Sequence, residues 1–350
     1  MRQSGIYLKS PNPAEYVILF IMKVSAIGEF GLIGRLDRMI AAAGVGSAKD
    51  LLIGIGDDCA AWKCSRKIQL ATVDSMVQDV HFTNATSTWR EIGYKALAIN
   101  LSDIAAMGGV PGYALINLAL PQDTDADDMF QLYEGIIGLA KETGTAIVGG
   151  NISGADKISI TVTIIGESLN GEILKRASSK PGDAIAITGW PGSAAAGLSM
   201  LMNGLKFDIE SANYFRNAFL HPTPRLKEGQ LLVKNGVKCA IDTSDGLLAD
   251  LKHICEASGV GAHINAADIP IHGLLKKNFK EKALEVALSG GEDYELLFTA
   301  SPEIVETVKK KLKVPANIIG EIKSGNPGEI RVVDNRGKTI NPKKIGWTHF

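Results

Sequence analysis

Acidic residues, and one asparagine, stand beside glycine or small polar residues at six places in this sequence, where together they could hold divalent metal ions. The six segments are residues 54–60 (GIGDDCA), 72–74 (TVD), 100–103 (NLSD), 149–153 (GGNIS), 242–246 (DTSDG) and 289–295 (SGGEDYE). Two like charges about 4 Å apart cost roughly 4 kcal/mol at an effective dielectric constant of 20, so converging carboxylates need a counter-cation. Oxygen ligands without neighbouring His or Cys favour Mg²⁺, which in proteins usually carries substrate phosphates. The glycines would let backbone N–H groups approach those phosphates.

Asp103 is the most informative of these residues because of its place on a predicted helix. Over residues 91–107 it shares one stripe with Ile92, Ala96, Ile99 and Met107. A carboxylate on an apolar stripe is costly unless it is paired or bound to metal. The pattern therefore favours a functional role for Asp103.

Asp74 and Asp242 each end an apolar run that predicts a strand, over residues 68–74 and 238–242. In α/β proteins ligand sites lie at strand ends. Each acidic motif also has a purely structural explanation, since Asp245 could cap a helix and the other acidic or glycine pairs could be turns. The joint occurrence of the motifs favours a single site.

Apolar periodicity predicts two α/β halves of similar size. In the first half we expect a helix from residue 31, strands over 68–74, 113–120, 145–148 and 158–166, and helices over 91–107 and 126–142. In the second we expect strands over 184–188, 238–242 and 295–299, helices over 193–202, 225–235, 246–257 and 303–312, and a β-rich tail. The polar stretch 175–183 predicts the joint. We therefore divide the chain into an extension (1–27), an N-terminal α/β domain (28–176) and a C-terminal α/β domain (177–350).

The composition excludes several classes of partner. Lys and Arg number 37 against 38 Asp and Glu, so the net charge of −1 offers no footprint for nucleic acid or an anionic membrane. Residues 17–22 (VILFIM) are too few to span a bilayer and few for a signal peptide. The cysteines lack a C-x-x-C spacing, so we expect small buried hydrophobes and a cytoplasmic protein; they are Cys59, Cys64, Cys239 and Cys255.

Several common nucleotide-binding and catalytic motifs are absent from the sequence. Gly337-Lys338-Thr339 does not complete a P-loop, because the position that needs the first glycine is Val332. There is no H-R-D and D-F-G kinase set, no G-x-S-x-G elbow, and no G-x-G-x-x-G after a strand. These absences leave the acidic segments as the candidate site.

The segments together resemble the thiamine-monophosphate kinase family. The resemblance rests on GIGDDCA, VHF at residues 80–82, YKALAINLSDIAAMG at 94–108, IDTSDGLL at 241–248, SGGEDYELLFT at 289–299 and GWTHF at 346–350. It covers the chain from about residue 28 to the end. It implies the two-domain fold, α/β with mixed sheets, of the aminoimidazole-ribonucleotide-synthetase-like ATP-binding superfamily, with a homodimer formed through the N-terminal domain.

The resemblance also implies a reaction and a set of site residues. The reaction is direct, in-line transfer of phosphate from ATP to thiamine monophosphate with several Mg²⁺ ions, giving thiamine diphosphate and ADP. The implied Mg²⁺ ligands are Asp58, Thr72, Val73, Asp74, Asp103, Asn151, Asp242 and Asp245, with Asp103 and Asp245 also expected to be catalytic. The implied ATP contacts are Gly150, Asn151, Arg176 and Ser244, and the implied substrate contacts are His81, Glu292 and Trp347. Because donor and acceptor are both polyanions, their approach needs cations more than it needs a base.

Two positions depart from the family pattern. Asn151 stands where the family usually has Asp, so the position keeps a carbonyl ligand but loses a charge. Val73 stands where the family usually has Thr, so any metal contact there must come from the backbone carbonyl. Of the substrate contacts, Glu292 could pair with the thiazolium or the aminopyrimidine, and Trp347 could stack on a ring.

Two alternatives remain open on the sequence alone. One is another enzyme of the superfamily, such as a selenophosphate or aminoimidazole ribonucleotide synthetase. Selenophosphate synthetases carry a reactive Cys or selenocysteine in an N-terminal glycine-rich loop, whereas no Cys precedes Cys59 here. The other is a non-catalytic nucleotide-binding relative, an option that Asn151 keeps open although the aspartate set argues against it.

Overall fold

The computed structural model describes residues 5–9, 16–20, 23–53, 55, 61–64 and 67–347; at residues 5–9, 16–20, 29–30 and 61 only the backbone is described. The chain forms two compact units that interleave along the sequence. The first comprises residues 1–63, 75–96 and 114–162, and the second comprises residues 64–74, 97–113 and 163–350. The domain boundary expected near residue 176 therefore does not coincide with these units, and that boundary stays a prediction.

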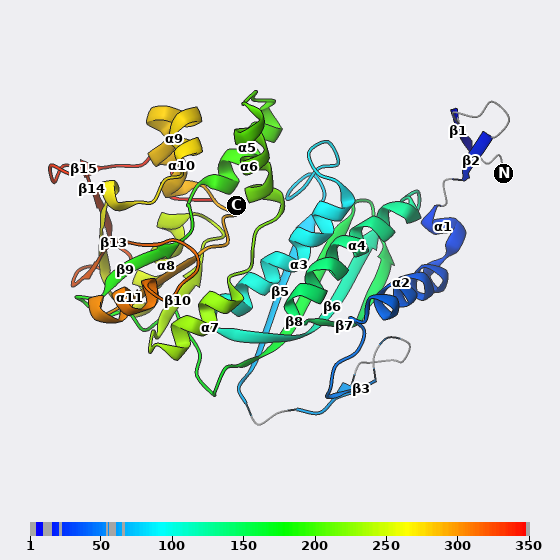
Figure 1. Ribbon diagram of the computed structural model, residues 1–350, viewed down its shortest axis with the longest axis horizontal. Helices are drawn as coiled ribbons and strands as arrows, with labels where there is room; N and C mark the ends of the chain where they lie inside the picture. Colours follow the sequence, from blue (N-terminus) through cyan, green and yellow to red (C-terminus); the bar gives the residue numbers. More distant parts are fainter. Residues whose placement is uncertain are drawn as a thin grey trace. The chain divides into compact units, whose positions relative to one another are not determined.

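Helices and strands alternate through most of the described chain (Figure 1). The strands are β1 Gly5–Lys9, β2 Tyr16–Phe20, β3 Leu51–Ile53, β4 Ala61–Trp62, β5 Gln69–Val77, β6 Gly109–Leu120, β7 Ala146–Gly154, β8 Ser159–Ser168, β9 Ala184–Thr188, β10 Cys239–Asp242, β11 Gly261–Asn265, β12 Leu296–Ala300, β13 Ala316–Lys323, β14 Ile330–Val333 and β15 Thr339–Ile340. The α-helices are α1 Val24–Ile27, α2 Glu29–Ala43, α3 Trp89–Ala106, α4 Ala126–Thr143, α5 Ser193–Asn203, α6 Ile209–Leu220, α7 Leu226–Lys234, α8 Leu247–Ser258, α9 Gly273–Phe279, α10 Ala283–Ser289 and α11 Pro302–Lys309.

A four-stranded sheet in the order β5-β8-β6-β7 carries the acidic residues of the first half. Along β6 and β8 buried and partly exposed side chains alternate, because successive residues of a strand point to opposite faces. Figure 1 shows α3 and α4 side by side across one face of this sheet. One face is thus core, and the other remains partly open.

The seven-stranded sheet in the order β10-β12-β9-β13-β11-β14-β15 is mixed, since its described pairings are antiparallel except β11 with β14. Every residue of β9, β10 and β12 is buried. In β9, Ile185 and Ile187 pack with α8 and α10, whereas Ala184 and Ala186 pack with α7 and α11. Helices therefore cover both faces of this sheet.

The second half of α3 packs closely on α7. A Cβ atom at Gly229 would come within 2.0 Å of the carbonyl oxygen of Ala105, so only glycine fits there. The side chain of Gln230 donates a hydrogen bond of 3.0 Å to the carbonyl of Gly109, and the backbone N–H of Leu174 donates to that of Met107. Residues 97–113 consequently belong to the same compact unit as the C-terminal half.

Most elements fall where the periodicity predicts them, with four differences. Strand β5 continues past Asp74 to Val77, so the expectation that Asp74 ends its strand is wrong. The sequence patterns predict neither helices α6, α9 and α10 nor strands β1, β2, β3, β4, β11 and β13. Cys64 is exposed, whereas Cys239 and Cys255 are buried as expected; Cys59 lies outside the described residues. The helix expected from residue 31 is preceded by α1 and begins at Glu29.

No helix in the described part of the chain is long and apolar enough to cross a membrane. Helices α3 and α4 each have 18 residues, but both carry several charged side chains. The apolar run expected to be too short for a span lies partly in β2.

Candidate active site

Three elements bring Thr72, Asp103 and Asp242 together in the second compact unit. The hydroxyl of Thr72, on β5, donates a hydrogen bond to Oδ2 of Asp103 on α3. The neighbouring hydroxyl of Ser102, also on α3, donates 2.7 Å to Oδ2 of Asp242 at the end of β10. Asp242 is only 3% exposed. The carboxylates that the sequence placed 139 residues apart are therefore neighbours, joined through adjacent positions of one helix.

The two carboxylates disfavour each other's charge. Burial raises the pKa of Asp103, while the hydrogen bond from Thr72 and the charge of Arg176 oppose the rise. Burial and then the charge of Asp103 raise the pKa of Asp242 to about 7, with the Ser102 hydrogen bond and Arg176 opposing. A pair of this kind holds a proton near neutral pH unless a cation replaces it.

Asp74 is fixed from behind by a buried asparagine. The backbone N–H of Asp74 donates 2.8 Å to Oδ1 of Asn100, which is fully buried on α3. The side chain of Asp74 itself is exposed. Helix α3 thus supports β5 at Thr72 and at Asp74, two residues apart on the same strand face.

The charges of four carboxylates act on the phenol of Tyr294. Burial raises its pKa well above the usual value for tyrosine, and the charges of Glu292, Asp242, Asp74 and Asp103 each add to the rise. These carboxylates come from four separate sequence segments, yet all lie within electrostatic range of one phenol. The predicted convergence of acidic motifs is therefore present in this unit of the structure.

Two acidic loops are hydrogen-bonded into one structure. The backbone N–H of Glu292 donates 2.7 Å to the carbonyl of Ser244, and that of Tyr294 donates 2.9 Å to the carbonyl of Thr243. In return the N–H of Thr243 donates 2.8 Å to the carbonyl of Glu295. Glu292 and Tyr294 both have positive φ angles, 68° and 51°, which side-chain-bearing residues rarely adopt. The position of the DTSDG loop therefore depends on that of the GGEDYE loop.

Asp250 holds the same loop from inside α8. It is 1% exposed, and its Oδ2 accepts hydrogen bonds from the backbone N–H groups of Asp245 (3.2 Å) and Gly246 (3.0 Å). Burial raises the pKa of Asp250 to about 8, the charges of Asp242 and Asp245 add to this, and the two N–H donors oppose it. The N-cap of α8 is Gly246, so the explanation of Asp245 as a helix cap is wrong. Among the described residues the Asp245 carboxylate has no hydrogen-bond or ion-pair partner.

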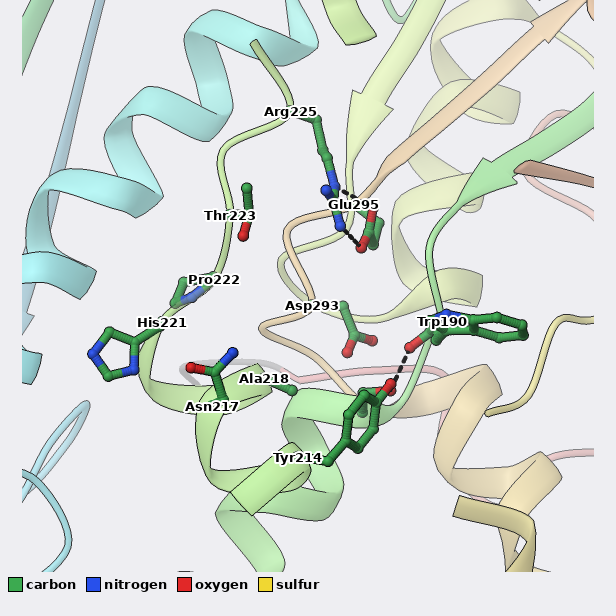
Figure 2. Close-up of a pocket in the computed structure, with 11 residues that line it drawn as sticks. Trp190, Tyr214, Asn217, Ala218, His221, Pro222, Thr223, Arg225, Asp293 and Glu295 are labelled. Atoms are coloured by element: carbon green, nitrogen blue, oxygen red, sulfur yellow. Dashed lines mark hydrogen bonds and ion pairs between the residues drawn. The ribbon is translucent and has the colours of Figure 1, made fainter. Parts of the chain in front are cut away.

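A buried ion pair holds the last residue of the GGEDYE loop (Figure 2). Glu295 is 7% exposed and accepts from both Nε (2.7 Å) and Nη2 of Arg225, as well as from the hydroxyl of Thr188 (2.6 Å). Asp293 accepts from the backbone N–H groups of Gly192 and Ala194 at the start of α5. Helix capping at Asp293 and charged pairing at Glu295 thus anchor the second half of this loop.

The remaining expected residues of the second unit lie around this centre in different states of burial. Arg176 is exposed, and its charge acts on both Asp103 and Asp242. Ser244 is partly buried and belongs to the hydrogen-bonded loop. Trp347 is 57% exposed, and its backbone N–H donates 2.9 Å to the carbonyl of Asp245. The side chain of Val73 is 58% exposed.

The expected residues of the first unit show local structural roles. A Cβ atom at Gly150 would come within 1.8 Å of the carbonyl oxygen of Ile116, so the close approach of β7 to β6 by itself requires glycine. Asn151 is exposed and donates 3.0 Å to the side chain of Asn117. Nδ1 of His81 accepts 3.1 Å from the backbone N–H of Val77.

The oxygen atoms gathered here suit a hard cation such as Mg²⁺, but the described side chains do not surround one completely. In the part of the chain that the structure describes, no three Asp, Glu, His or Cys side chains are arranged to hold one metal ion. Mg²⁺ is usually held by one or two carboxylates together with waters and substrate phosphates, so such an arrangement suits it. Repulsion between Asp103 and Asp242 and the unpartnered Asp245 are the structural grounds for a cation. Asp58 lies outside the described residues.

Sequence reasoning assigned no individual role to five supporting residues, although the first three stand within the acidic segments: Asn100, Asp293, Tyr294, Asp250 and Arg225. The available signals were weak, because two lie in helices as ordinary polar residues and Arg225 lies in a proline-bounded loop. Asp250 does have a detectable signal, since it stands four residues after the N-cap Gly246 of a helix that otherwise begins with leucines.

Two family models match most of the chain. Residues 56–168 match "AIR synthase related protein, N-terminal domain", and residues 180–333 match "AIR synthase related protein, C-terminal domain". The fold, α/β with mixed sheets, and the carboxylate site thus define a two-domain protein of the AIR-synthase-related class.

Individual relatives and solved structures identify the family within this class. Thiamine-monophosphate kinase of Bacillus subtilis is 40% identical over 309 residues, covering 85% of this chain and 93% of the relative. A crystal structure of thiamine-monophosphate kinase from Stenotrophomonas maltophilia has a TM-score of 0.78 at 33% identity, covering 87% of this chain and 96% of the other. A structure described as AaThiL complexed with AMPPCP and TMP has a TM-score of 0.72 at 31% identity, covering 95% and 100%. The chain belongs to the thiamine-monophosphate kinase family.

Proposed function

We propose that this protein transfers the γ-phosphate of ATP to thiamine monophosphate, directly and in-line, to form thiamine diphosphate and ADP. One observation carries the proposal at the level of the site: Thr72 donates a hydrogen bond to Asp103, and the next residue of α3, Ser102, donates one to Asp242, so that carboxylates from distant segments gather at one place. A polyanionic donor and acceptor cannot approach such a cluster without cations, whereas with cations the cluster becomes a phosphate-binding site. The relative complexed with AMPPCP, an ATP analogue, and TMP supports both ligands.

The proposed Mg²⁺ ligands are those that the resemblance implies. They are Thr72, the Val73 carbonyl, Asp74, Asp103, Asn151, Asp242, Asp245 and, outside the described residues, Asp58. Bound Mg²⁺ would neutralise the phosphate oxygens and orient donor and acceptor for in-line transfer. Asp103 and Asp245 are the proposed catalytic residues. Asp103 is held by Thr72, and the Asp245 carboxylate has no hydrogen-bond or ion-pair partner in the part of the chain that the structure describes.

In this mechanism the side chains of the protein bind ATP and position the reacting phosphates. Arg176 is suited to ATP phosphates because its cationic side chain is exposed beside the acidic centre. Gly150, Asn151 and Ser244 complete the proposed ATP contacts. The acceptor phosphate already carries a nucleophilic oxygen, so no side chain need act as a strong base.

His81, Glu292 and Trp347 are the proposed substrate contacts. Glu292 would place a negative charge against the thiazolium, and the exposed ring of Trp347 can stack on a heterocycle. The ring of His81 is oriented by the backbone N–H of Val77, which donates to its Nδ1. We further propose a cytoplasmic homodimer with domains 28–176 and 177–350.

The direct test incubates the purified protein with ATP, MgCl₂ and thiamine monophosphate and measures thiamine diphosphate and ADP. Free thiamine and aminoimidazole precursors run in parallel as acceptors. Asp103→Asn at limiting Mg²⁺ is expected to lower kcat at least about tenfold, which corresponds to roughly 1.4 kcal/mol in the barrier. ADP without thiamine diphosphate, or binding of ATP without turnover, would contradict the proposal and favour a different superfamily enzyme or a binding protein.

A further inference from the structure

A hollow of about 320 Å³ lies near the start of β5, away from the acidic centre. Its wall includes Ile68, Glu172, Ile173, Lys175, Ser178 and Lys238, all of them in the second compact unit. Ile68 stands six residues before Asp74, which is about 20 Å along an extended strand, and Arg176 does not line the hollow. Ligand pockets usually measure roughly 300–1,000 Å³, so this hollow suits a small molecule of about one ring.

Backbone hydrogen bonds fix the walls of the hollow. The turn at residues 170–171 has φ angles of 57° and 77°, as a two-residue hairpin of type I′ requires, and it leads directly to Glu172. The N–H of the last residue of β8 donates 2.8 Å to the carbonyl of Ile68, and the N–H of Lys175 donates 2.9 Å to the carbonyl of Lys238. A hollow formed in this way costs little conformational entropy when a ligand enters.

The wall carries one more positive charge than negative charges. Lys238 and Glu172 form an exposed ion pair of 2.9 Å, so their charges offset each other. Lys175 is exposed, and its ammonium has no hydrogen-bond or ion-pair partner in the described part of the chain. With two lysines and one glutamate, the wall has a net charge of +1. A ligand with a single negative charge matches it, whereas a second negative charge would face Glu172.

Apolar surface lies in the same hollow as the lysine. The side chain of Ile68 is 45% exposed, and that of Ile173 is partly buried. Ser178 is also partly buried and adds a hydroxyl to the wall. Removing apolar surface from water is favourable in proportion to the area covered, so a ligand with an apolar body gains from both isoleucines. The hollow therefore offers one charged contact, one hydroxyl and an apolar floor.

We propose that this hollow binds a small organic monocarboxylate with an apolar body of about one ring. The carboxylate would accept hydrogen bonds from the ammonium of Lys175 and the hydroxyl of Ser178, while the ring lies against Ile68 and Ile173. The net charge of the wall selects a monoanion over the dianion of a phosphate monoester. The inference does not rest on the proposed function, because none of the proposed metal, ATP or acceptor contacts lines the hollow.

The first test measures benzoate binding to the full chain by calorimetry in EDTA. Carboxylates can approach the acidic centre only through a bound cation, so EDTA confines the measurement to other sites. Three further probes separate the contributions: benzyl alcohol keeps the ring without the charge, acetate keeps the charge without the ring, and phenyl phosphate adds a second charge. Each is expected to bind more weakly than benzoate. Equal binding of benzyl alcohol, or no binding of benzoate, overturns the inference.

The second test changes the charge of the wall. Lys175→Met is expected to weaken benzoate binding about three- to fivefold, the upper range for an exposed ion pair. Lys180→Met is the matched control, because Lys180 is exposed nearby in sequence but does not line the hollow. Glu172→Gln leaves Lys238 without its ionic partner and is expected to strengthen binding about two- to threefold. Unchanged binding in Lys175→Met, or an equal loss in Lys180→Met, overturns the inference.

The third test locates the ligand by NMR. In protein labelled at isoleucine δ1-methyl groups, the signals of Ile68 and Ile173 are assigned from Ile68→Val and Ile173→Val variants. Both signals are expected to shift as benzoate is added, with the same dissociation constant that calorimetry gives, and to shift less in Lys175→Met. Shifts confined to other isoleucines would place the ligand elsewhere and overturn the inference.

Discussion

Replacing Asp242 by asparagine is expected to stabilise the metal-free protein above neutral pH while it removes activity. The buried carboxylate has a pKa of about 7, against 3.8 for a free aspartate. Its stabilising contribution is therefore fully present below pH 3.8 and is lost as the pH rises through 7. Asparagine carries no charge at either pH and keeps an oxygen that can accept from Ser102.

The size of the effect follows from the pKa difference of about 3 units. Each unit corresponds to about 1.4 kcal/mol, so Asp242→Asn gains at most about 4 kcal/mol over wild type at pH 8 and far less at pH 5. This figure is an upper bound because Asp103 shares the titration, and removing the charge of Asp242 also relieves Asp103.

The assay is urea unfolding in EDTA at pH 5 and at pH 8, with Asp156→Asn as a control. Asp156 lies on an exposed loop of the other compact unit, so its substitution is expected to leave the free energy of unfolding unchanged at pH 5 and at pH 8. Added Mg²⁺ is expected to stabilise wild type more than Asp242→Asn, because a ligand that binds only the folded state raises its stability. In the kinase assay Asp242→Asn is expected to lose at least about tenfold in kcat.

One result would refute this reasoning. If Asp242→Asn is less stable than wild type at pH 8 in EDTA, or if the difference between them is the same at pH 5, the carboxylate is not strained by burial and by Asp103. The structural argument for a cation would then lose its main support.

Three other predictions concern Asp250 and Arg225, which hold the acidic loops, and Asn151, a proposed metal ligand. Asp250→Ala removes the acceptor of two backbone N–H groups in the DTSDG loop. In a steady-state assay kcat/KM is therefore expected to fall by about tenfold, and the Mg²⁺ concentration needed for activity is expected to rise. Asp250→Asn keeps an acceptor and is expected to have a smaller effect in the same assay. Arg225→Met leaves Glu295 buried without its ionic partner and is expected to lower the free energy of unfolding by about 3 kcal/mol in urea titration. Asn151→Asp restores a charge and is expected to reduce the Mg²⁺ concentration needed for half-maximal rate.

Each of these predictions has a result that contradicts it. Equal kinetics for Asp250→Ala and Asp250→Asn would mean that the hydrogen bonds to the loop do not matter for the reaction. Unfolding of Arg225→Met within about 0.5 kcal/mol of wild type would mean that Thr188 alone satisfies Glu295. An unchanged Mg²⁺ requirement in Asn151→Asp would mean that position 151 does not ligate metal.

The sequence predicts the centre of the site well because local patterns mark it. Asp103 interrupts an apolar helical stripe, and it is indeed held by a hydrogen bond from Thr72. Asp242 ends a short run of apolar residues, and β10 ends at that residue with every position buried. For Asp74 the same argument fails, because β5 does not end there but continues through Ser75 and Met76 to Val77.

What the sequence could not predict depends on contacts between distant residues. Asn100 accepts from Asp74, and Arg225 pairs with Glu295 70 residues away. Such partners are polar residues with no local signature, and only the packed fold shows that they are buried. The exposure of Cys64 is missed for the same reason, since a cysteine among mixed neighbours has no period that fixes its face.

The close approach of α7 to α3 limits how the molecule can be divided. The glycine at 229 touches the α3 backbone at Ala105, and α3 also carries Ser102 against Asp242. A fragment that starts at residue 177 would expose this surface and leave Asp242 without its hydroxyl donor. The second half therefore cannot be exchanged between homologous proteins by itself. A natural or engineered chimaera has to take α3 and the second half from the same parent protein.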